Sequence, residues 1–148
     1  MKRIISLMLM VLPLSAMAQI PEFTKLVSEY TLDESVTTVN IDKNLIAMMG
    51  AEMEGLENIE LIELIMTEDK NLGDKIVAKT HKIAKKNDAR VLVSHSSTED
   101  DITVYALGNN DEITHIILAM HTEDKYGAAV ITGNIAIEEI DKLIHVQM

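Results

Sequence analysis

The first half of the chain alternates between helical and extended hydrophobic patterns. Apolar residues recur at helical spacing through residues 20–30, which predicts an amphipathic helix whose first turn contains Pro21. Residues 35–41 are rich in β-branched side chains and predict a strand, after which Asp42 is suited to cap a short helix. Residues 71–86 predict a second amphipathic helix, because their apolar stripe lies opposite a stripe of lysines.

Residues 59–67 carry two conflicting patterns. Their Ile and Leu content is typical of a strand that is buried on both sides. Glutamates also recur at every third position through this region, which would give a helix an acidic face: Glu54, Glu57, Glu60 and Glu63. We expect a strand preceded by a loop or helix end, and we keep the helix as the alternative.

From residue 91 onward, short apolar segments are separated by polar turns. Strands are expected at residues 91–97, 102–107, 113–122 and 128–132. The turns between them are short enough to join only antiparallel neighbours. Gly133 and Asn134 are expected to close this meander, and the spacing of Ile137, Ile140, Leu143 and Ile144 predicts a last helix. The chain is therefore expected to be α+β, with an antiparallel four-stranded meander plus two N-terminal strands and helices packed mainly on one face.

The predicted meander has two faces of different composition. One face is apolar throughout and is the expected seat of the helices: Val91, Val93, Ile102, Val104, Ala106, Ile113, Ile117, Ala119 and Val130. The other face mixes apolar and hydroxyl side chains: Leu92, Ser94, Thr103, Tyr105, Leu107, Thr114, Ile116, Leu118 and Met120. Such a mixed face is expected to be covered partly or reversibly by another molecule. The predicted partner-binding residues are Tyr105, Leu107, Ile116 and Leu118.

The N-terminus has the pattern of a secretory signal peptide. Lys2 and Arg3 precede an apolar run of 11 residues from Ile4 to Leu14, and small residues lead to a cleavage site after Ala18. That run is too short to cross about 30 Å of hydrocarbon as a helix, and no longer apolar stretch follows it. We therefore expect a signal peptide at residues 1–18, a single domain at residues 19–148, and a periplasmic or secreted protein without a transmembrane segment after cleavage.

Composition and charge exclude several classes of function. The absence of cysteine excludes disulfide scaffolds, thiolate metal sites and a lipid-modified cysteine. The net charge is −11, aromatic residues make up 3% of the chain, and tryptophan is absent. The chain thus lacks both the positive charge and the stacking surface that nucleic-acid binding requires, and we expect no nucleic-acid partner.

Histidines and acidic turns are the candidate metal ligands. On the predicted register His95, His115 and His121 share a face, but alternate strands lie about 9–10 Å apart, too far for two imidazoles to reach one ion at about 2 Å. The acidic turns at residues 99–101 and 123–124 lie at one end of the meander and could gather a hard cation such as calcium. Acidic turns of this kind are more often simply exposed to solvent than bound to a cation. We expect no cofactor and no metal site, and leave cation binding by the acidic turns open.

The sequence offers no set of catalytic residues. His95 lies between Ser94 and Ser96, but neighbours in a strand point to opposite faces, so this histidine cannot activate either serine. A nucleophile elbow, a phosphate loop and a dinucleotide fingerprint are all missing from the sequence. The lysine stripe of residues 71–86 fits either a dock for an acidic partner or a solvated helix face, and the solvated face is favoured.

Three stretches of sequence resemble a known family. They are the run ITGNIAIEEIDKL at residues 131–143, the strand at residues 36–41 followed by DKNLIAMM, and Phe23 with Tyr30. They resemble the DUF4252 family, small exported proteins of Bacteroidota, over essentially the whole mature chain. The resemblance supplies no catalytic residues. It implies export and a link to envelope-stress signalling, because such proteins tend to be encoded near sigma-factor and anti-sigma genes. Some members carry a lipid-attachment cysteine, which this chain lacks.

These patterns together predict an exported, non-enzymatic domain that binds a protein or peptide in the cell envelope through the mixed sheet face. One alternative is a carrier of a small apolar ligand, with a pocket between sheet and helices lined by flexible methionines: Met48, Met49, Met53 and Met66. A hydrolase is the less favoured alternative, because it would need a convergent polar cluster.

Overall fold

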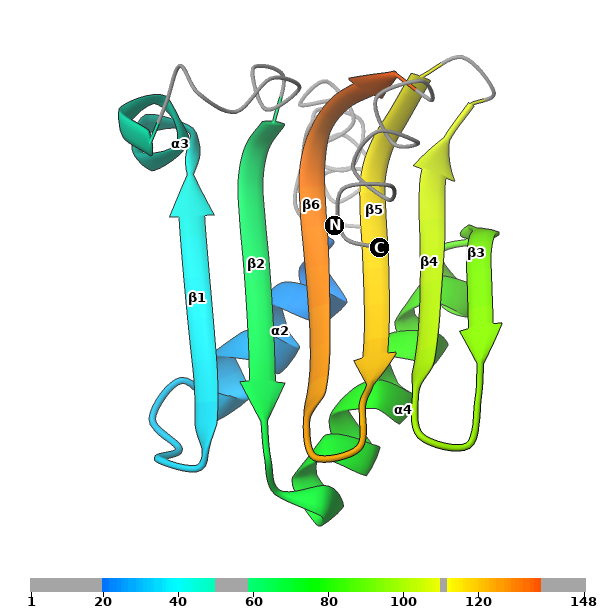
Figure 1. Ribbon diagram of the computed structural model, residues 1–148. Helices are drawn as coiled ribbons and strands as arrows, with labels where there is room; N and C mark the ends of the chain where they lie inside the picture. The colour runs from blue at the N-terminus through cyan, green and yellow to red at the C-terminus, as the bar shows by residue number, and fades with distance from the viewer. Residues whose placement is uncertain (1–19, 50–58, 110–111, 137–148) are drawn as a thin grey trace, which may run out of the picture.

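The computed structural model describes residues 20–49, 59–109 and 112–136 (Figure 1). Its strands form one antiparallel six-stranded sheet in the order β1-β2-β6-β5-β4-β3. The strands are β1 (Val36–Asp42), β2 (Ile59–Thr67), β3 (Arg90–Ser96), β4 (Asp101–Gly108), β5 (Glu112–His121) and β6 (Tyr126–Ala136). The helices are α2 (Pro21–Tyr30), α3 (Lys43–Met49) and α4 (Lys70–Lys86).

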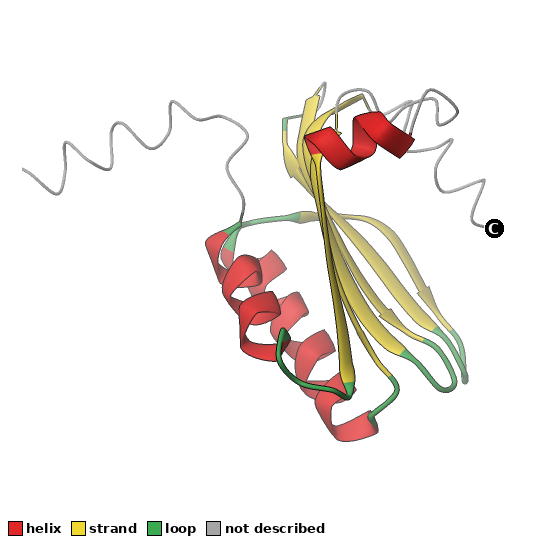
Figure 2. Cartoon of the chain, turned by 90° about the vertical axis from the view of Figure 1, so that its left-hand side faces the viewer, coloured by secondary structure: helices red, strands yellow, loops and turns green. Residues whose placement is uncertain are grey.

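Two helices cover one face of this sheet. Figure 2 shows α2 and α4 on the same side, and α4 packs mainly against β5 and β6. The core between these helices and the sheet is aliphatic except for a few rings: Phe23, Leu26, Val27, Ile65, Ile76, Ile83, Tyr105, Ile117, Ala128 and Val130. The short helix α3 lies at the ends of β1 and β2 and contacts both strands. We call the side covered by α2 and α4 the helix face, and the opposite side the open face.

Local signals explain where the helices begin. The Asp42 carboxylate accepts a hydrogen bond from the Leu45 N–H at 2.9 Å, as expected for the residue that caps α3. Asp69 caps α4 in the same way, with 3.0 Å to the Leu72 N–H. Pro21 stands in the first turn of α2, where its missing N–H costs nothing.

The expected α+β fold class is confirmed, and the last strand of the meander, β6, is longer than expected. Residues 59–67 are a strand, paired with β1 on one side and with β6 on the other. Gly133 and Asn134 do not close the meander as expected, because β6 continues to Ala136 and pairs there with Glu112. The expected signal peptide at residues 1–18 and the expected last helix at residues 137–144 lie outside the described residues.

The predicted assignment of side chains to faces is wrong for β4, for Val93 and Ser94 of β3, and for Ile113 of β5. At the β4–β5 turn Gly108 pairs with Ile113, and a bulge at Thr114 then shifts the pairing of β4 with β5 by one residue. Tyr105 therefore pairs with Ile117, and Leu107 with His115. Because a shift of one residue exchanges the two faces of a strand, Tyr105 and Leu107 lie on the helix face.

Candidate functional site

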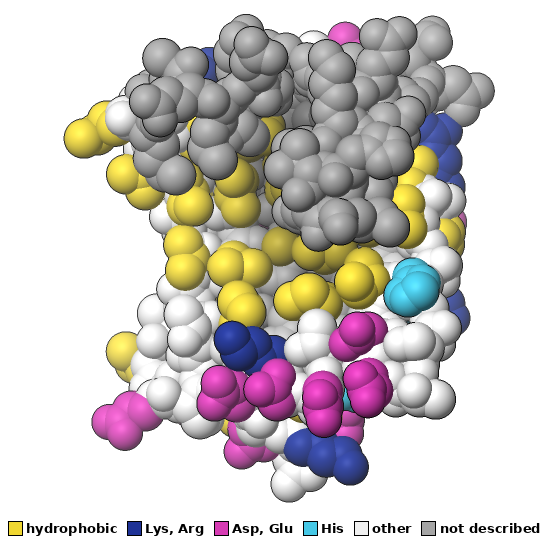
Figure 3. Space-filling model, viewed as in Figure 1, with side chains coloured by type: hydrophobic (Ala, Val, Ile, Leu, Met, Phe, Trp, Pro, Cys, Tyr) yellow, Lys and Arg dark blue, Asp and Glu magenta, His cyan; other side chains and the backbone are white. Residues whose placement is uncertain are grey.

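The open face is an apolar surface that extends over five strands. Apart from Glu60 at the bulge of β2, the described residues of β1, β2, β6, β5 and β4 that point to this face carry no charge. We call the following residues the apolar patch: Val39, Ile62, Leu64, Met66, Ile102, Val104, Leu118, Met120, Ala129 and Ile131. Figure 3, which looks onto the open face, shows a band of hydrophobic side chains running from side to side above the acidic lower margin. The bulge at Thr114 makes this face more apolar than predicted, because it places Thr103 on the helix face and Ile102 and Val104 on the open face.

The structure separates the four predicted partner-binding residues. Tyr105 is 7% exposed and belongs to the core beneath the helices, and Leu107 packs against that core. Ile116 lies on the open face but is only 6% exposed, in a small cluster with Ala106 and Ile113. Leu118 is partly exposed on the open face. Of the four, only Leu118 therefore combines the open face with access to a partner.

One end of the sheet is strongly acidic. The loops 31–35, 68–69, 97–100 and 122–125 all lie at this end, because β1, β4 and β6 begin there and β2, β3 and β5 end there. Each loop contributes two adjacent acidic residues: Asp33 and Glu34, Glu68 and Asp69, Glu99 and Asp100, Glu123 and Asp124. Lys125 is the only base in these loops. We call this the acidic end; Figure 3 shows acidic side chains along the lower margin of the open face.

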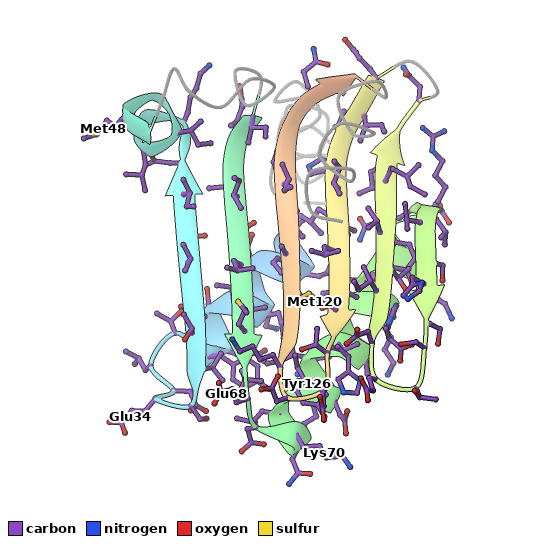
Figure 4. All side chains as sticks on the ribbon, in the orientation of Figure 1. Glu34, Met48, Glu68, Lys70, Met120 and Tyr126 are labelled. Atoms are coloured by element: carbon purple, nitrogen blue, oxygen red, sulfur yellow. The ribbon has the colours of Figure 1, made fainter. Side chains whose placement is uncertain are left out.

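A cavity of about 460 Å³ lies where the acidic end meets the apolar patch. Its lining combines carboxylates with hydroxyl and apolar side chains: Glu34, Ser35, Thr37, Met66, Thr67, Glu68, Asp69 and Lys125. Figure 4 shows Glu34 and Glu68 at the lower margin of the sheet. Thr37 and Met66 point to the open face, so the cavity is continuous with the apolar patch.

The histidines do not gather as the sequence predicted. His95 pairs with Ile102 and lies on the open face, whereas His115 pairs with Leu107 on the helix face. His121 also lies on the helix face, where it stacks on Tyr126 with ring centroids 4.3 Å apart. The register shift at Thr114 again accounts for the difference. In the described part of the chain, no three His, Asp or Glu side chains are grouped so that they could hold a metal ion.

Two polar pairs lie under the helices, and the sequence did not point to either. Tyr105 and His81 of α4 share a hydrogen bond of 2.6 Å, and burial lowers the pKa of His81 and raises that of Tyr105. Glu63 of β2 is 1% exposed, and its carboxylate accepts a hydrogen bond of 3.3 Å from the Thr24 hydroxyl of α2. Burial raises the pKa of Glu63, because desolvation disfavours the charged carboxylate more than this bond favours it.

Glu63→Gln is expected to stabilise the protein in a pH-dependent way. Because the folded-state pKa of Glu63 is raised, its contribution to stability falls as pH rises from the unfolded value of about 4.3 through the folded value. Glutamine imitates the protonated form, so the gain should be small near the unfolded pKa and reach about 1–2 kcal/mol at neutral pH. Urea unfolding at the two pH values measures this difference.

The matched control is Glu68→Gln, which removes the same charge from an exposed position. We expect it to change stability by less than about 0.5 kcal/mol at either pH. If Glu63→Gln is stabilised equally at both pH values, the buried charge of Glu63 is not the cause of the gain in stability.

The carrier alternative requires a pocket between the sheet and the helices. A second cavity of about 270 Å³ lies between α2 and α4, lined by Glu22, Lys25, Leu26, Glu29, Lys79, Lys82 and Ile83. Neither cavity lies between sheet and helices, where the carrier alternative requires one. Met66 points to the open face, Met48 is 82% exposed, and Met53 lies outside the described residues.

Among the helices that the structure describes, none has the length and hydropathy needed to cross a membrane.

Comparison with known proteins identifies one family. The family described as Domain of unknown function (DUF4252) matches residues 30–143 of the chain. This range includes both N-terminal strands, α4 and the whole meander. The comparison found no match among curated proteins and none among solved structures.

Proposed function

The chain belongs to the DUF4252 family, and from this premise we propose that it is an exported, non-enzymatic domain that binds a protein or peptide in the cell envelope through the apolar patch. The observation that carries the proposal is the open face itself. Apart from Glu60 at the bulge of β2, the described residues of five neighbouring strands present no charge on this face, although 25% of all residues in the chain are charged.

Such a distribution is not needed for folding alone. An antiparallel sheet that faces water on one side usually alternates apolar side chains with polar ones. Continuous apolar surface on a soluble domain is typical of a site that another molecule covers, because its burial contributes roughly 25 cal/mol per Å². The binding residues proposed from the structure are therefore Leu64, Met66, Leu118 and Met120, and Leu118 is the only one of the original four predicted residues retained.

The test compares variants on the two sides of the sheet. We expect the exported protein to capture a partner from envelope extract, and the double variant Leu64→Gln/Leu118→Gln to lose at least about tenfold in capture, as truncated anchors at interface centres do. The control Lys79→Gln/Lys82→Gln changes exposed positions on the helix side and should capture normally.

Thermal unfolding of each variant shows whether it is folded. Equal capture by the folded open-face variant and by wild type would contradict the proposal. Loss of capture in the Lys79→Gln/Lys82→Gln control would move the binding surface to the helix side.

A further inference from the structure

Charged side chains are segregated in this protein. The loops of the acidic end hold eight carboxylates against one lysine, Lys125, and Lys70 follows them at the start of α4 (Figure 4). Most lysines instead lie on the outer side of α4, away from the open face, and are exposed: Lys70, Lys75, Lys79, Lys82, Lys85 and Lys86. The apolar patch is thus bordered at one end by negative charge that no nearby row of lysines offsets.

The carboxylates of the acidic end are available to a partner. The ion pairs among the described residues join Lys43 to Glu60 and Lys79 to Glu29, and neither pair involves the acidic end. Asp69 accepts a hydrogen bond at the start of α4, and Asp33 accepts two from Ser35. The remaining charge faces water, where a cation from a partner can approach it.

We propose that the apolar patch binds an amphipathic, basic segment of another protein, whose apolar stripe packs on the sheet and whose Lys or Arg side chains reach the acidic end. This inference rests on the proposed function and adds the chemistry of the partner. Charge complementarity carries it: an acidic partner would meet like charge at this margin, and like charges across an interface cost several kcal/mol.

The cavity beside Glu34 and Glu68 provides a place for one such cation. Its volume of about 460 Å³ exceeds that of a single Lys or Arg side chain. The apolar stem of that side chain can pack on Met66, while its charged head reaches the carboxylates of Glu34, Glu68 and Asp69. The lining contains three carboxylates and one base, Lys125, so the cavity has a net negative charge.

A second copy of this chain is a poorer occupant. Two chains with a formal net charge of −11 each repel one another, and the described residues of the open face offer no basic row to the acidic end of a second copy. Sedimentation of the protein without peptide tests this alternative directly, since a dimer dissociated by Leu64→Gln/Leu118→Gln would assign the patch to self-association and overturn the proposal.

The experiment uses a labelled amphipathic helical peptide of Leu and Lys, about four turns long, and a matched peptide with Glu in place of Lys. Fluorescence anisotropy with the exported protein measures both affinities at low and high salt. We expect the Lys peptide to bind at least about tenfold more tightly than the Glu peptide, and to weaken as salt screens the acidic end.

Two double variants separate the patch from the charge. Glu34→Gln/Glu68→Gln should weaken binding of the Lys peptide by about fivefold, within the range of two exposed ion pairs. Glu60→Gln/Glu112→Gln removes the same net charge at the opposite end of the sheet and should leave the affinity unchanged. Leu64→Gln/Leu118→Gln should reduce binding of either peptide at least about tenfold.

The outcomes distinguish failure of the inference about charge from failure of the proposed function. Equal binding of both peptides, still lost in Leu64→Gln/Leu118→Gln, would overturn the inference about charge and leave the proposed function standing. Binding that depends on Glu34 and Glu68 but not on the apolar patch would overturn both. Equal losses in the two glutamine pairs would reduce the effect to net charge and overturn the role of the acidic end, and failure of the Lys peptide to bind would overturn the proposed partner chemistry.

Discussion

Gly73→Ala is expected to destabilise the protein by about 2–4 kcal/mol, although alanine favours helix by about 1 kcal/mol over glycine. Gly73 lies in the first turns of α4 and is buried. A methyl group there would overlap Cβ and Cγ of Tyr126, the first residue of β6. Tyr126 cannot move aside easily, because it is 5% exposed and stacked on His121. The helix would have to shift away from β5 and β6, the strands it covers.

Thermal unfolding measures the effect, which should lower the midpoint by about 8–15 °C for a domain of this size. Ala78→Gly is the matched control, since Ala78 is exposed on the same helix and its replacement should cost only about 1 kcal/mol. In the double variant Gly73→Ala/Tyr126→Ala the two losses should be less than additive, because the clash is removed with the ring. A higher midpoint for Gly73→Ala would mean that helix and strand are further apart than described.

The positions of helices and strands could be predicted because each depends on a local pattern. The period of apolar residues separates α4 from the strands of the meander, and Asp42 sits where its side chain caps a helix. The order of the sheet beyond the meander is not local. β2 pairs with β6, which lies more than fifty residues later in the chain, and no periodicity within either strand specifies that neighbour.

The faces of the sheet could not be predicted from alternation alone. A single extra residue at Thr114 reverses which side of β4 meets which side of β5, and Thr114 itself is an ordinary strand residue. The predicted face is therefore correct for Leu118 and wrong for Tyr105. Glu63 was missed for a related reason: a charged residue in an apolar strand normally marks the solvent side, whereas this carboxyl group lies under α2.

Lysine substitutions at the neighbouring positions Ile117 and Leu118 are expected to have opposite outcomes for folding. Ile117 is fully buried between the sheet and the helices, in contact with the core that contains Tyr105 and Val130. A lysine there must either bury its ammonium group or lose its proton, and both cost several kcal/mol. Since domains of this kind are stable by about 5–15 kcal/mol, Ile117→Lys should be largely unfolded or close to it at room temperature.

Leu118→Lys should remain folded, with a loss of about 1 kcal/mol, because the lysine stem can lie along the apolar patch while its ammonium group reaches water. Circular dichroism and urea midpoints of the two variants measure the contrast. Ile117→Val controls for the loss of volume and should cost about 1 kcal/mol. If Leu118→Lys unfolds as readily as Ile117→Lys, the open face is itself an interior surface of the folded chain. The apolar patch would then serve stability, and partner binding would have to be sought at the acidic end or on the lysine side of α4.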